Sequence, residues 1–385
     1  MDGALLQPGQ RTSDLVVASI QSLIVDVPTV RKHKLSQTSV TAQSYVIVRL
    51  RLANGVEGIG EAATLGGPRW SGESVEAIKA NIDAYLAPSV VGLRADRFEA
   101  AGTAMNEAAK RNNAAKGAIE TALFDAVGKS LGLPASALLG GAVRDSIPVL
   151  WTLASGDPAQ EIEEAERKLA ARLHCTFKVK VGALEPVADM ARMRRLAAAL
   201  GDRAKLIVDA NQAWDETVSA RCLPQLQEMG VALVEQPVPA WNLAAMARLR
   251  ARPVTPPLLA DECVFDTHDM LAVAAAGAAD AVSLKIVKHA GLLGVRKVAA
   301  VAEAGGIGLY GGCLLESSVG AAAHLQVFAT LPTLAWGCEH FGPQILTSDL
   351  VTEPLRFADF HVHLPAGPGI GVTLDEAAVR RFTRS

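Results

Sequence analysis

The sequence predicts an α/β protein built around a closed barrel of parallel strands, preceded by a smaller α+β unit. From residue 147 onward short apolar runs recur, each followed by a stretch with helical periodicity, and such alternation gives parallel strands with right-handed crossovers. Eight runs favour a closed barrel over a doubly wound sheet, since no G-x-G-x-x-G stands at a strand–helix turn. The runs span 147–153, 177–182, 206–210, 231–235, 257–261, 281–286, 307–311 and 333–337, with helical stretches such as 158–173, 186–200 and 291–304.

The first third of the chain mixes strands and helices, which predicts an α+β unit. The dipeptide Asn54-Gly55 is a strong signal for a tight turn between two strands. The expected segments are an apolar run over 16–27 that ends at Pro28, two strands within 44–62, a helix that begins at Ser71–Ser74 and reaches about Leu86, and a helix over 113–131 that ends near Gly132.

These patterns divide the chain into four parts. The tail after about residue 350 is irregular and is expected to pack back on the N-terminal unit. The expected parts are a flexible leader over 1–14, an α+β domain over 15–145, a barrel over 146–350 and a C-terminal segment over 351–385.

Composition excludes several classes of protein. With 37 Lys and Arg against 40 Asp and Glu, the net charge is −3, which argues against a basic nucleic-acid surface. The five cysteines form no C-x-x-C pair, so neither a disulfide framework nor a zinc ribbon is indicated. Because no apolar stretch reaches the length of a membrane span and the first residues lack a signal-peptide pattern, we expect a soluble cytoplasmic protein.

Three acidic residues end consecutive strand candidates. Asp209, Glu235 and Asp261 are each separated by 26 residues, one strand–helix unit, which places them at one level of the C-terminal mouth, where barrel enzymes keep their active sites. One strand-ending acid is more often a helix cap or a solvated side chain. Three in phase would repel one another, and a hard divalent cation such as Mg²⁺ relieves that repulsion. Glu262 is one residue out of phase and is expected to point away.

Lysines flank these acids in the same phase. Lys178 and Lys180 alternate along one strand, whose other face is apolar, so both should point into the barrel; alone, such a pair more often lines a solvated face. Lys285 follows Asp261 by 24 residues and should face Lys180 across the ligand. Beside a divalent cation and partly desolvated, a lysine pKa falls toward neutrality, so such an amine can exchange a proton with a carbon acid.

These residues resemble the enolase superfamily, in its muconate lactonizing branch. The resemblance extends over nearly the whole chain and implies a (β/α)7β barrel, an α+β capping domain completed by the C-terminal tail, and a homo-oligomer, usually an octamer. The most specific runs are W-T-L-A-S-G-D at 151–157, K-V-K at 178–180, D-A-N-Q at 209–212, E-Q-P at 235–237, A-D-E at 260–262, L-Y-G-G at 309–312 and G-C-E at 337–339.

The resemblance also implies a reaction and roles. The reaction is closure of cis,cis-muconate to muconolactone in aromatic degradation through catechol: one carboxylate adds across the conjugated system, and the enolate that forms is held by the metal and protonated at its α-carbon. The resemblance implies that Asp209, Glu235 and Asp261 bind Mn²⁺ or Mg²⁺ and that Asn211 supports the metal shell. It implies that Lys180 transfers the proton and that Lys178 orients Lys180 and tunes its basicity. It also implies that Lys285, with Glu339 beside it, stabilises charge from the opposite face.

Substrate preference stays open at this level. His33–Ser36 and Lys288 are of the muconate type, whereas the loop 66–71 is more like that of chloromuconate cycloisomerases. Chloromuconate, or another carboxylate acted on by a racemase, epimerase or dehydratase, remains an alternative, as does a barrel kept only for binding. The candidates for substrate contact are Arg69, Trp70, Lys288 and Glu316; for Arg69 a solvated loop position is at least as good an interpretation.

Overall fold

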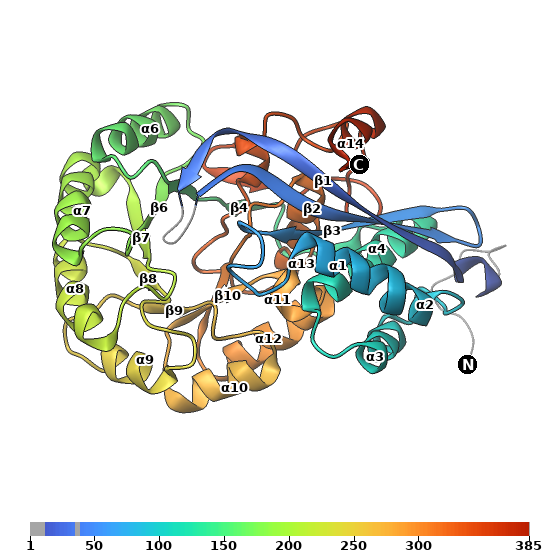
Figure 1. Cartoon of the computed structure of the whole chain (residues 1–385), viewed down its shortest axis with the longest axis horizontal. Coiled ribbons are helices and arrows are strands. Elements are labelled where there is room, and N and C mark those ends of the chain that lie inside the picture. The colour runs from blue at the N-terminus through green and yellow to red at the C-terminus, as the bar shows by residue number, and fades with distance from the viewer. Residues whose placement is uncertain (1–11, 35–38, 385) are drawn as a thin grey trace.

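The computed structural model describes residues 12–34 and 39–384. It contains a seven-stranded parallel sheet curled into a barrel, a three-stranded antiparallel sheet from the N-terminal part of the chain, and a small three-stranded sheet that includes the C-terminal segment. Figure 1 shows the barrel on one side of the molecule and the long strands of the N-terminal domain on the other. The predicted α/β class, with a barrel and a capping domain, is confirmed.

The capping sheet has the order β1-β2-β3. Gly55 adopts a φ of +84° in the turn between β2 and β3, as the Asn54-Gly55 signal predicts. The strand β1 does not end at Pro28 but continues to Lys34, because a register shift after Pro28 accommodates the proline. The strands are β1 (Val17–Lys34), β2 (Ser39–Leu52) and β3 (Glu57–Thr64).

One long, almost fully buried helix, α4 (Asn113–Leu131), lies between the capping sheet and the barrel. It packs on β3 and on α11 (Ile286–His289) of the barrel. The contact with β3 needs glycine, because a Cβ at Gly58 or Gly60 would stand about 2 Å from a backbone oxygen of α4. The other capping helices are α1 (Val75–Asn81), whose N-cap Ser74 lies in the predicted start, the π-helical turn η2 (Ile82–Leu86), α2 (Ala87–Val90), α3 (Phe98–Ala108) and α5 (Ala135–Leu138).

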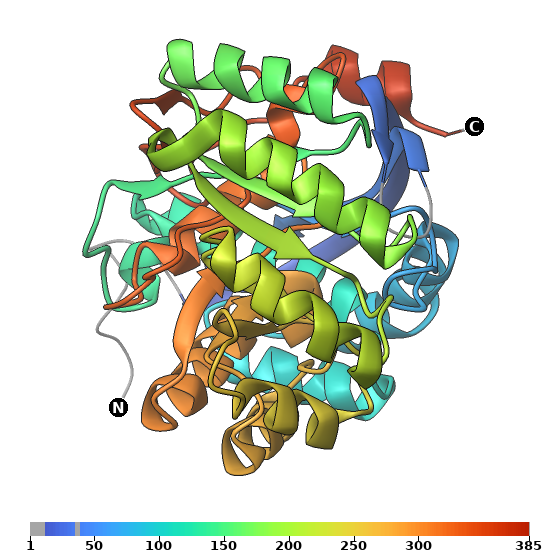
Figure 2. The ribbon, with the colours of Figure 1, turned by 90° about the vertical axis from the view of Figure 1, so that its left-hand side faces the viewer.

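The barrel strands follow one another in the order β5 to β11, all parallel. Their helices form an outer layer, and Figure 2 shows those from residues 158 to 276 side by side across one face. The strands are β5 (Trp151–Leu153), β6 (Thr176–Lys180), β7 (Lys205–Asp209), β8 (Leu233–Glu235), β9 (Leu258–Ala260), β10 (Ala281–Leu284) and β11 (Gly308–Gly311). The helices are α6 (Pro158–Ala170), α7 (Pro186–Leu200), α8 (Glu216–Glu228), α9 (Leu243–Arg250), α10 (Thr267–Ala276), α12 (Leu292–Ala304) and α13 (Ser318–Phe328), with the 3-10 turn η3 (Gly201–Arg203).

The barrel closes a few residues later than the sequence predicts. The eighth run, 333–337, forms no strand; instead Cys338 makes single bridges to Val149 on one side and to Gly311 on the other. The first run, 147–153, is split, because residues 146–148 form β4 (Ser146–Pro148) and pair with the C-terminal segment while Trp151–Leu153 joins the barrel. The residue 337–339 segment is thus the closing contact of the barrel.

The C-terminal segment is more regular than predicted. After the 3-10 turn η4 (Gly342–Ile345) it contains β12 (Phe357–Ala358), β13 (His361–His363) and α14 (Glu376–Phe382). Thr383 then bridges Val25 of β1, so the chain ends against the capping sheet. At the other end, residues 1–11 of the predicted leader lie outside the described residues, and a 3-10 turn η1 (Thr12–Leu15) begins before its predicted boundary at residue 14.

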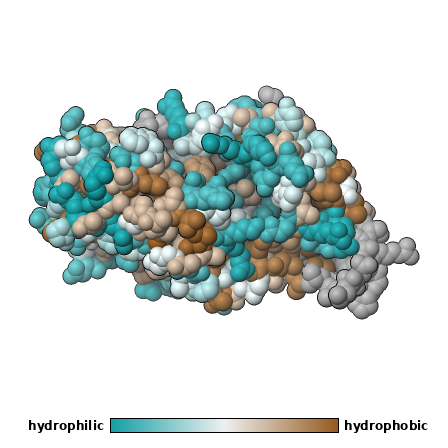
Figure 3. All heavy atoms as spheres, turned by 90° about the horizontal axis from the view of Figure 1, so that it is seen from below, coloured by the Kyte–Doolittle hydropathy of each residue, from teal (hydrophilic) through white to brown (hydrophobic). Residues whose placement is uncertain are grey.

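None of the helices in the part of the chain that the structure describes combines enough length with enough hydropathy to cross a bilayer. Figure 3 shows one face, where hydrophilic side chains surround smaller hydrophobic patches. The barrel and the capping sheet share one continuous core of mainly Ala, Val, Leu and Ile side chains.

Candidate active site at the barrel mouth

Three carboxylates stand at one level of the barrel mouth. Asp209 ends β7 and pairs in register with Glu235, which ends β8, while Asp261 directly follows β9. All three side chains are almost completely buried. This is the arrangement that their constant spacing predicts for parallel strands.

Two lysines flank these acids inside the same pocket. In the sheet order, β6 carries Lys180 on one side of the acid-bearing strands, and Lys285 follows β10 on the other. The side chains leave only about 20 Å³ of cavity volume between them, close to the space of a single water molecule. The pocket is lined by Leu65, Trp70, Thr152, Lys180, Asp209, Asn211, Glu235, Asp261, Lys285, Cys313, Leu314, Leu315 and Glu339.

The two lysines of β6 each pair with an acid. Lys180 donates to Asp209. Lys178 lies 2.5 Å from Glu235 Oε2 and 2.7 Å from Glu339 Oε2, and its side chain is fully buried. The alternation of β6 therefore directs both amines into the barrel, as the apolar residues of the other face require.

On the opposite side, Asp261 accepts two amines. Lys285 Nζ donates to Asp261 Oδ2 at 2.6 Å, and Lys288 Nζ donates to Oδ1 at 2.8 Å. Burial alone would raise the pKa of Asp261, but the two ammonium groups outweigh it and hold the pKa well below its ordinary value. Asp261 is thus a carboxylate held in its charged form by two buried cations.

Burial and the neighbouring acids together raise the pKa of Glu235 well above its ordinary value. Burial is the largest cause and the neighbouring charge of Asp209 the next. For Lys180, burial lowers the pKa and the charge of Asp209 more than offsets it, so the net shift is upward. The pKa of Lys180 is expected to fall only when a cation lies beside these acids. The charges of the carboxylates alone raise it.

The donor set fits a hard divalent cation. Carboxylate oxygens are the ligands that Mg²⁺ and Mn²⁺ prefer. The raised pKa of Glu235 beside Asp209 means that added positive charge would stabilise the ionised acids. In the structure their oxygens are drawn to the four lysine amines described above rather than gathered around one point. Asp209, Glu235 and Asp261 therefore do not form a closed ligand cluster among the described residues.

A different trio does have its potential ligand atoms within 4.8 Å of one another. It consists of Glu316, His324 and His340, all buried. However, His324 Nδ1 lies 2.8 Å from the carbonyl oxygen of Gly320, and its Nε2 accepts the backbone N–H of Ile286 at 2.9 Å. Because both ring nitrogens of His324 are engaged, this trio lacks a third free ligand, and the three strand-end acids remain the better cation site.

Asn211 connects the site to Glu262. Its side-chain oxygen accepts from Lys180 Nζ at 3.1 Å, and its Nδ2 donates to Glu262 Oε1 at 3.1 Å. The prediction that Glu262 points away is therefore wrong: the chain leaves the strand geometry at Asp261, so the period of two no longer applies. Burial, and then the charge of Asp261, raise the pKa of Glu262 to about 7.

The four residues predicted to contact the substrate lie in different surroundings. Trp70 lines the pocket, with the centre of its ring 4.1 Å from Lys285 Nζ. Arg69, Lys288 and Glu316 are absent from the described residues that line it. Arg69 is exposed, Lys288 is turned to Asp261, and Glu316 accepts the backbone N–H of Leu314 at 2.9 Å. Lys288 and Glu316 are thus engaged with the protein itself in this structure, and their contact with a substrate stays a prediction.

Several lining residues had no signal in the sequence. Leu65 and Thr152 follow or belong to strands, but no spacing marks them. The Cys313–Leu315 segment follows β11 in the way that active-site loops follow barrel strands, and that position was the one available sign. The Cys313–Leu315 segment gives the pocket an apolar wall beside its charged residues.

Comparison with known proteins identifies the family. The chain matches the family models described as the mandelate racemase / muconate lactonizing enzyme N-terminal domain, over residues 19–140, and the enolase C-terminal domain-like family, over residues 160–378. It is 46% identical to muconate cycloisomerase 1 of Pseudomonas putida, with 97% of this chain and 100% of that protein aligned. It is 47% identical to a chloromuconate cycloisomerase of Pseudomonas sp. (strain P51), with 96% and 99% aligned.

Solved structures agree. The muconate lactonizing enzyme of Pseudomonas fluorescens, complexed with muconolactone, superposes with a TM-score of 0.95 at 45% identity, covering 96% of this chain and 100% of that one. The similarity thus includes both the barrel and the capping domain. On the strength of this match and of the acids and lysines at the barrel mouth, the chain belongs to the muconate lactonizing branch of the enolase superfamily.

Proposed function

We propose that this protein is a muconate cycloisomerase, an intramolecular lyase that interconverts cis,cis-muconate and muconolactone in aromatic catabolism. One observation carries the proposal: Lys180 and Lys285 lie on opposite sides of three acids that share one level of the mouth. Such a site can hold a carboxylate between two amines and move a proton at the neighbouring carbon. The names of the relatives support the substrate.

The acids have the role of holding a divalent cation. Asp209, Glu235 and Asp261 would bind Mn²⁺ or Mg²⁺, which when bound supplies positive charge that stabilises a substrate carboxylate as negative charge develops on it. Lys180 now donates to Asp209 and Lys285 to Asp261, so two of these three acids already lie beside positive charge.

Lys180 has the role of proton donor. When one carboxylate of muconate adds across the conjugated double bond, the carbon next to the other carboxylate gains a proton, and Lys180 Nζ gives it. Burial and the nearby charge of Lys178 lower the pKa of Lys180 but do not outweigh Asp209, whose charge raises it, so the amine carries the proton that it would donate. Glu339 and Glu235 hold Lys178 in place.

Lys285 and Trp70 form the opposite wall. The ring of Trp70 lies over the ammonium of Lys285, a cation–π contact that holds the amine toward the pocket, where it would stabilise negative charge on the substrate. Trp70 stands in the loop that resembles chloromuconate enzymes. Because a relative named as a chloromuconate cycloisomerase is 47% identical to this chain, 2-chloromuconate is the alternative substrate to compare with muconate.

The proposal is tested by measuring the loss of ultraviolet absorbance of cis,cis-muconate. After chelation, the purified enzyme should be inactive, and added Mn²⁺ or Mg²⁺ should restore turnover. The rates on muconate and 2-chloromuconate then rank the two substrates. Muconate left unchanged in the presence of Mn²⁺ would reject the proposal and favour a racemase, epimerase or dehydratase acting on another carboxylate.

The assembly proposed with this function is a homo-oligomer, an octamer by resemblance to the family. Light scattering of the purified protein gives its mass directly. With a chain mass of 40.3 kDa, a mass of one chain in solution would contradict the proposal.

A further inference from the structure

The apolar wall of the pocket is a loop with an unusual backbone. Cys313, Leu314 and Leu315 follow β11 and line the pocket. Leu315 has a φ of +61°, in the left-handed region that a leucine rarely adopts. A residue in this conformation persists only where its surroundings hold it there, so the contacts of the loop decide where the wall stands.

Those contacts come from the capping sheet. Gln43 Nε2 donates to the carbonyl oxygen of Leu314 at 2.7 Å, and the hydroxyl of Tyr45 donates to that of Leu315 at 2.7 Å. Both side chains are buried. Gln43 Nε2 also donates to the carbonyl oxygen of Thr64 at 2.7 Å, which fixes its amide on the sheet. Two consecutive carbonyls of the wall are therefore attached to β2, some 270 residues away in the chain.

A third contact holds the end of the loop. Glu61 of β3 accepts the backbone N–H of Ser317 at 3.1 Å and also the hydroxyl of Ser317. Ser317 is the N-cap of α13, so the side chain of Glu61 stands at the start of that helix, where backbone N–H groups lack partners within the helix.

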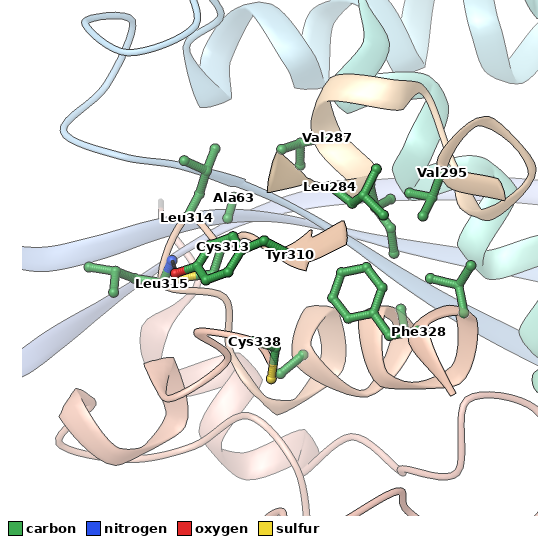
Figure 4. Close-up of a cluster of buried hydrophobic side chains, with 14 of the residues drawn as sticks. Ala63, Leu284, Val287, Val295, Tyr310, Cys313, Leu314, Leu315, Phe328 and Cys338 are labelled. Carbon is green, nitrogen blue, oxygen red and sulfur yellow. Dashed lines mark hydrogen bonds between the residues drawn. The ribbon is translucent and has the colours of Figure 1, made fainter. Parts of the chain in front are cut away.

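The three contacts share one face of the capping sheet because of its register. Tyr45 pairs with Ala63 and Ile47 pairs with Glu61, so Gln43, Tyr45 and Glu61 point to the same side. Figure 4 shows Ala63 in one buried cluster with Cys313, Leu314 and Leu315. This face of the sheet thus meets the pocket loop through both polar and apolar contacts.

We infer that Gln43, Tyr45 and Glu61 are positioning residues through which the capping sheet sets the apolar wall of the active site, and with it the affinity for substrate. The inference rests on the proposed function and extends it to residues outside the pocket. None of the three lines the pocket in the described part of the chain. They act through Leu314, Leu315 and Ser317.

The test is Tyr45→Phe, which removes one hydroxyl and keeps the ring. The carbonyl of Leu315 loses its donor, and the strained backbone can relax. The KM for muconate should rise about tenfold, in line with one lost hydrogen bond to a buried group, while kcat and Mn²⁺ affinity stay within about twofold of wild type. Ser44→Ala is the matched control, because the hydroxyl of the adjacent residue bonds Asp26 of β1 instead, and its KM should not change.

A second readout needs no turnover. Cys313 is a buried thiol in the loop, and Cys222 is a buried thiol in α8. Peptide-resolved alkylation should label Cys313 faster in Tyr45→Phe than in wild type, with Cys222 unchanged.

The outcomes separate the two claims. The inference is overturned if Tyr45→Phe keeps both the wild-type KM and the wild-type rate of Cys313 labelling. It is also overturned if kcat and metal affinity fall while KM stays constant. A change in melting temperature alters neither conclusion. If wild type fails to convert muconate but Cys313 labelling still rises in the variant, the proposed substrate is wrong while the capping contacts do hold the loop.

Discussion

At the scale of single residues, charged and polar groups surround Lys180, the proposed proton donor. It is held between Asp209 and Asn211, and its neighbour Lys178 opposes its charge. Replacing it by Met removes the proton donor and keeps the length of the side chain. Lys180→Met should lower turnover by at least about 10²-fold, the scale of a general acid–base residue, while Mn²⁺ affinity stays similar or rises.

The control for that variant is Lys205→Met at the exposed start of β7, which should retain full turnover. Both proteins are compared by muconate absorbance and by Mn²⁺ titration. Near-wild-type activity in Lys180→Met would show that the proton comes from another group.

Asp261 is the residue whose loss should act first on the metal. It accepts from both Lys285 and Lys288, and an amide at this position is a weaker ligand for a hard cation. Asp261→Asn should weaken Mn²⁺ binding by at least about tenfold, measured by calorimetry. Unchanged Mn²⁺ affinity would remove Asp261 from the ligand set.

At the scale of elements, the close approach of Gly312 to Lys285 gives a sharp test. A Cβ at Gly312 would stand 2.1 Å from Ser283 Oγ and 2.5 Å from Lys285 Cε. Gly312→Ala should push Lys285 out of place and lower kcat by about tenfold or more, since small misplacements of catalytic groups are costly. Gly102→Ala in α3, where nothing lies within 4 Å of the new methyl, is the control, and equal kcat in the two variants would contradict the prediction.

Element-scale comparison also shows what spacing can and cannot predict. The alternation over 177–182 directed Lys178 and Lys180 inward because strand geometry has a strict period of two. The same rule gave the wrong direction for Glu262, because the strand ends at Ala260 and the alternation does not continue past it. The Cys313–Leu315 wall could not be predicted, since contacts with β2, far away in the sequence, fix it.

At the scale of the whole molecule, the two domains meet through buried polar groups as well as apolar ones. Glu120 of α4 is buried and accepts the backbone N–H of Leu293 at the start of α12. Burial, the largest cause, raises its pKa from 4.5 to about 8. The folded protein therefore holds a proton on Glu120 that the unfolded chain has already lost, so the stability it contributes is complete below about pH 4.5 and is lost as the pH rises through about 8.

Glu120→Gln removes this dependence and keeps the acceptor oxygen. The fall in melting temperature between about pH 6 and about pH 9 should be smaller in the variant than in wild type. Glu107→Gln on the exposed face of α3 should leave the fall unchanged. Parallel pH profiles for Glu120→Gln and wild type would show that Glu120 is already ionised in the folded protein.

The global architecture was predictable because strand–helix alternation over about half the chain leaves few topologies. The exact closure of the barrel was not predictable, because the eighth strand is reduced to single bridges at Cys338. So short a contact has no periodicity to detect. The strands of the tail could not be predicted for a similar reason, since β12 and β13 are only two and three residues long, and β13 pairs with the distant β4.

The central claim, that the acids ending β7, β8 and β9 hold one cation between two lysines, is tested most directly by anomalous diffraction from crystals of the Mn²⁺-loaded enzyme. We predict one strong manganese peak bound by Asp209, Glu235 and Asp261, with Lys180 and Lys285 on opposite sides of it. A peak bound instead by Glu316 and His340, or by fewer than two of the three acids, would contradict the account.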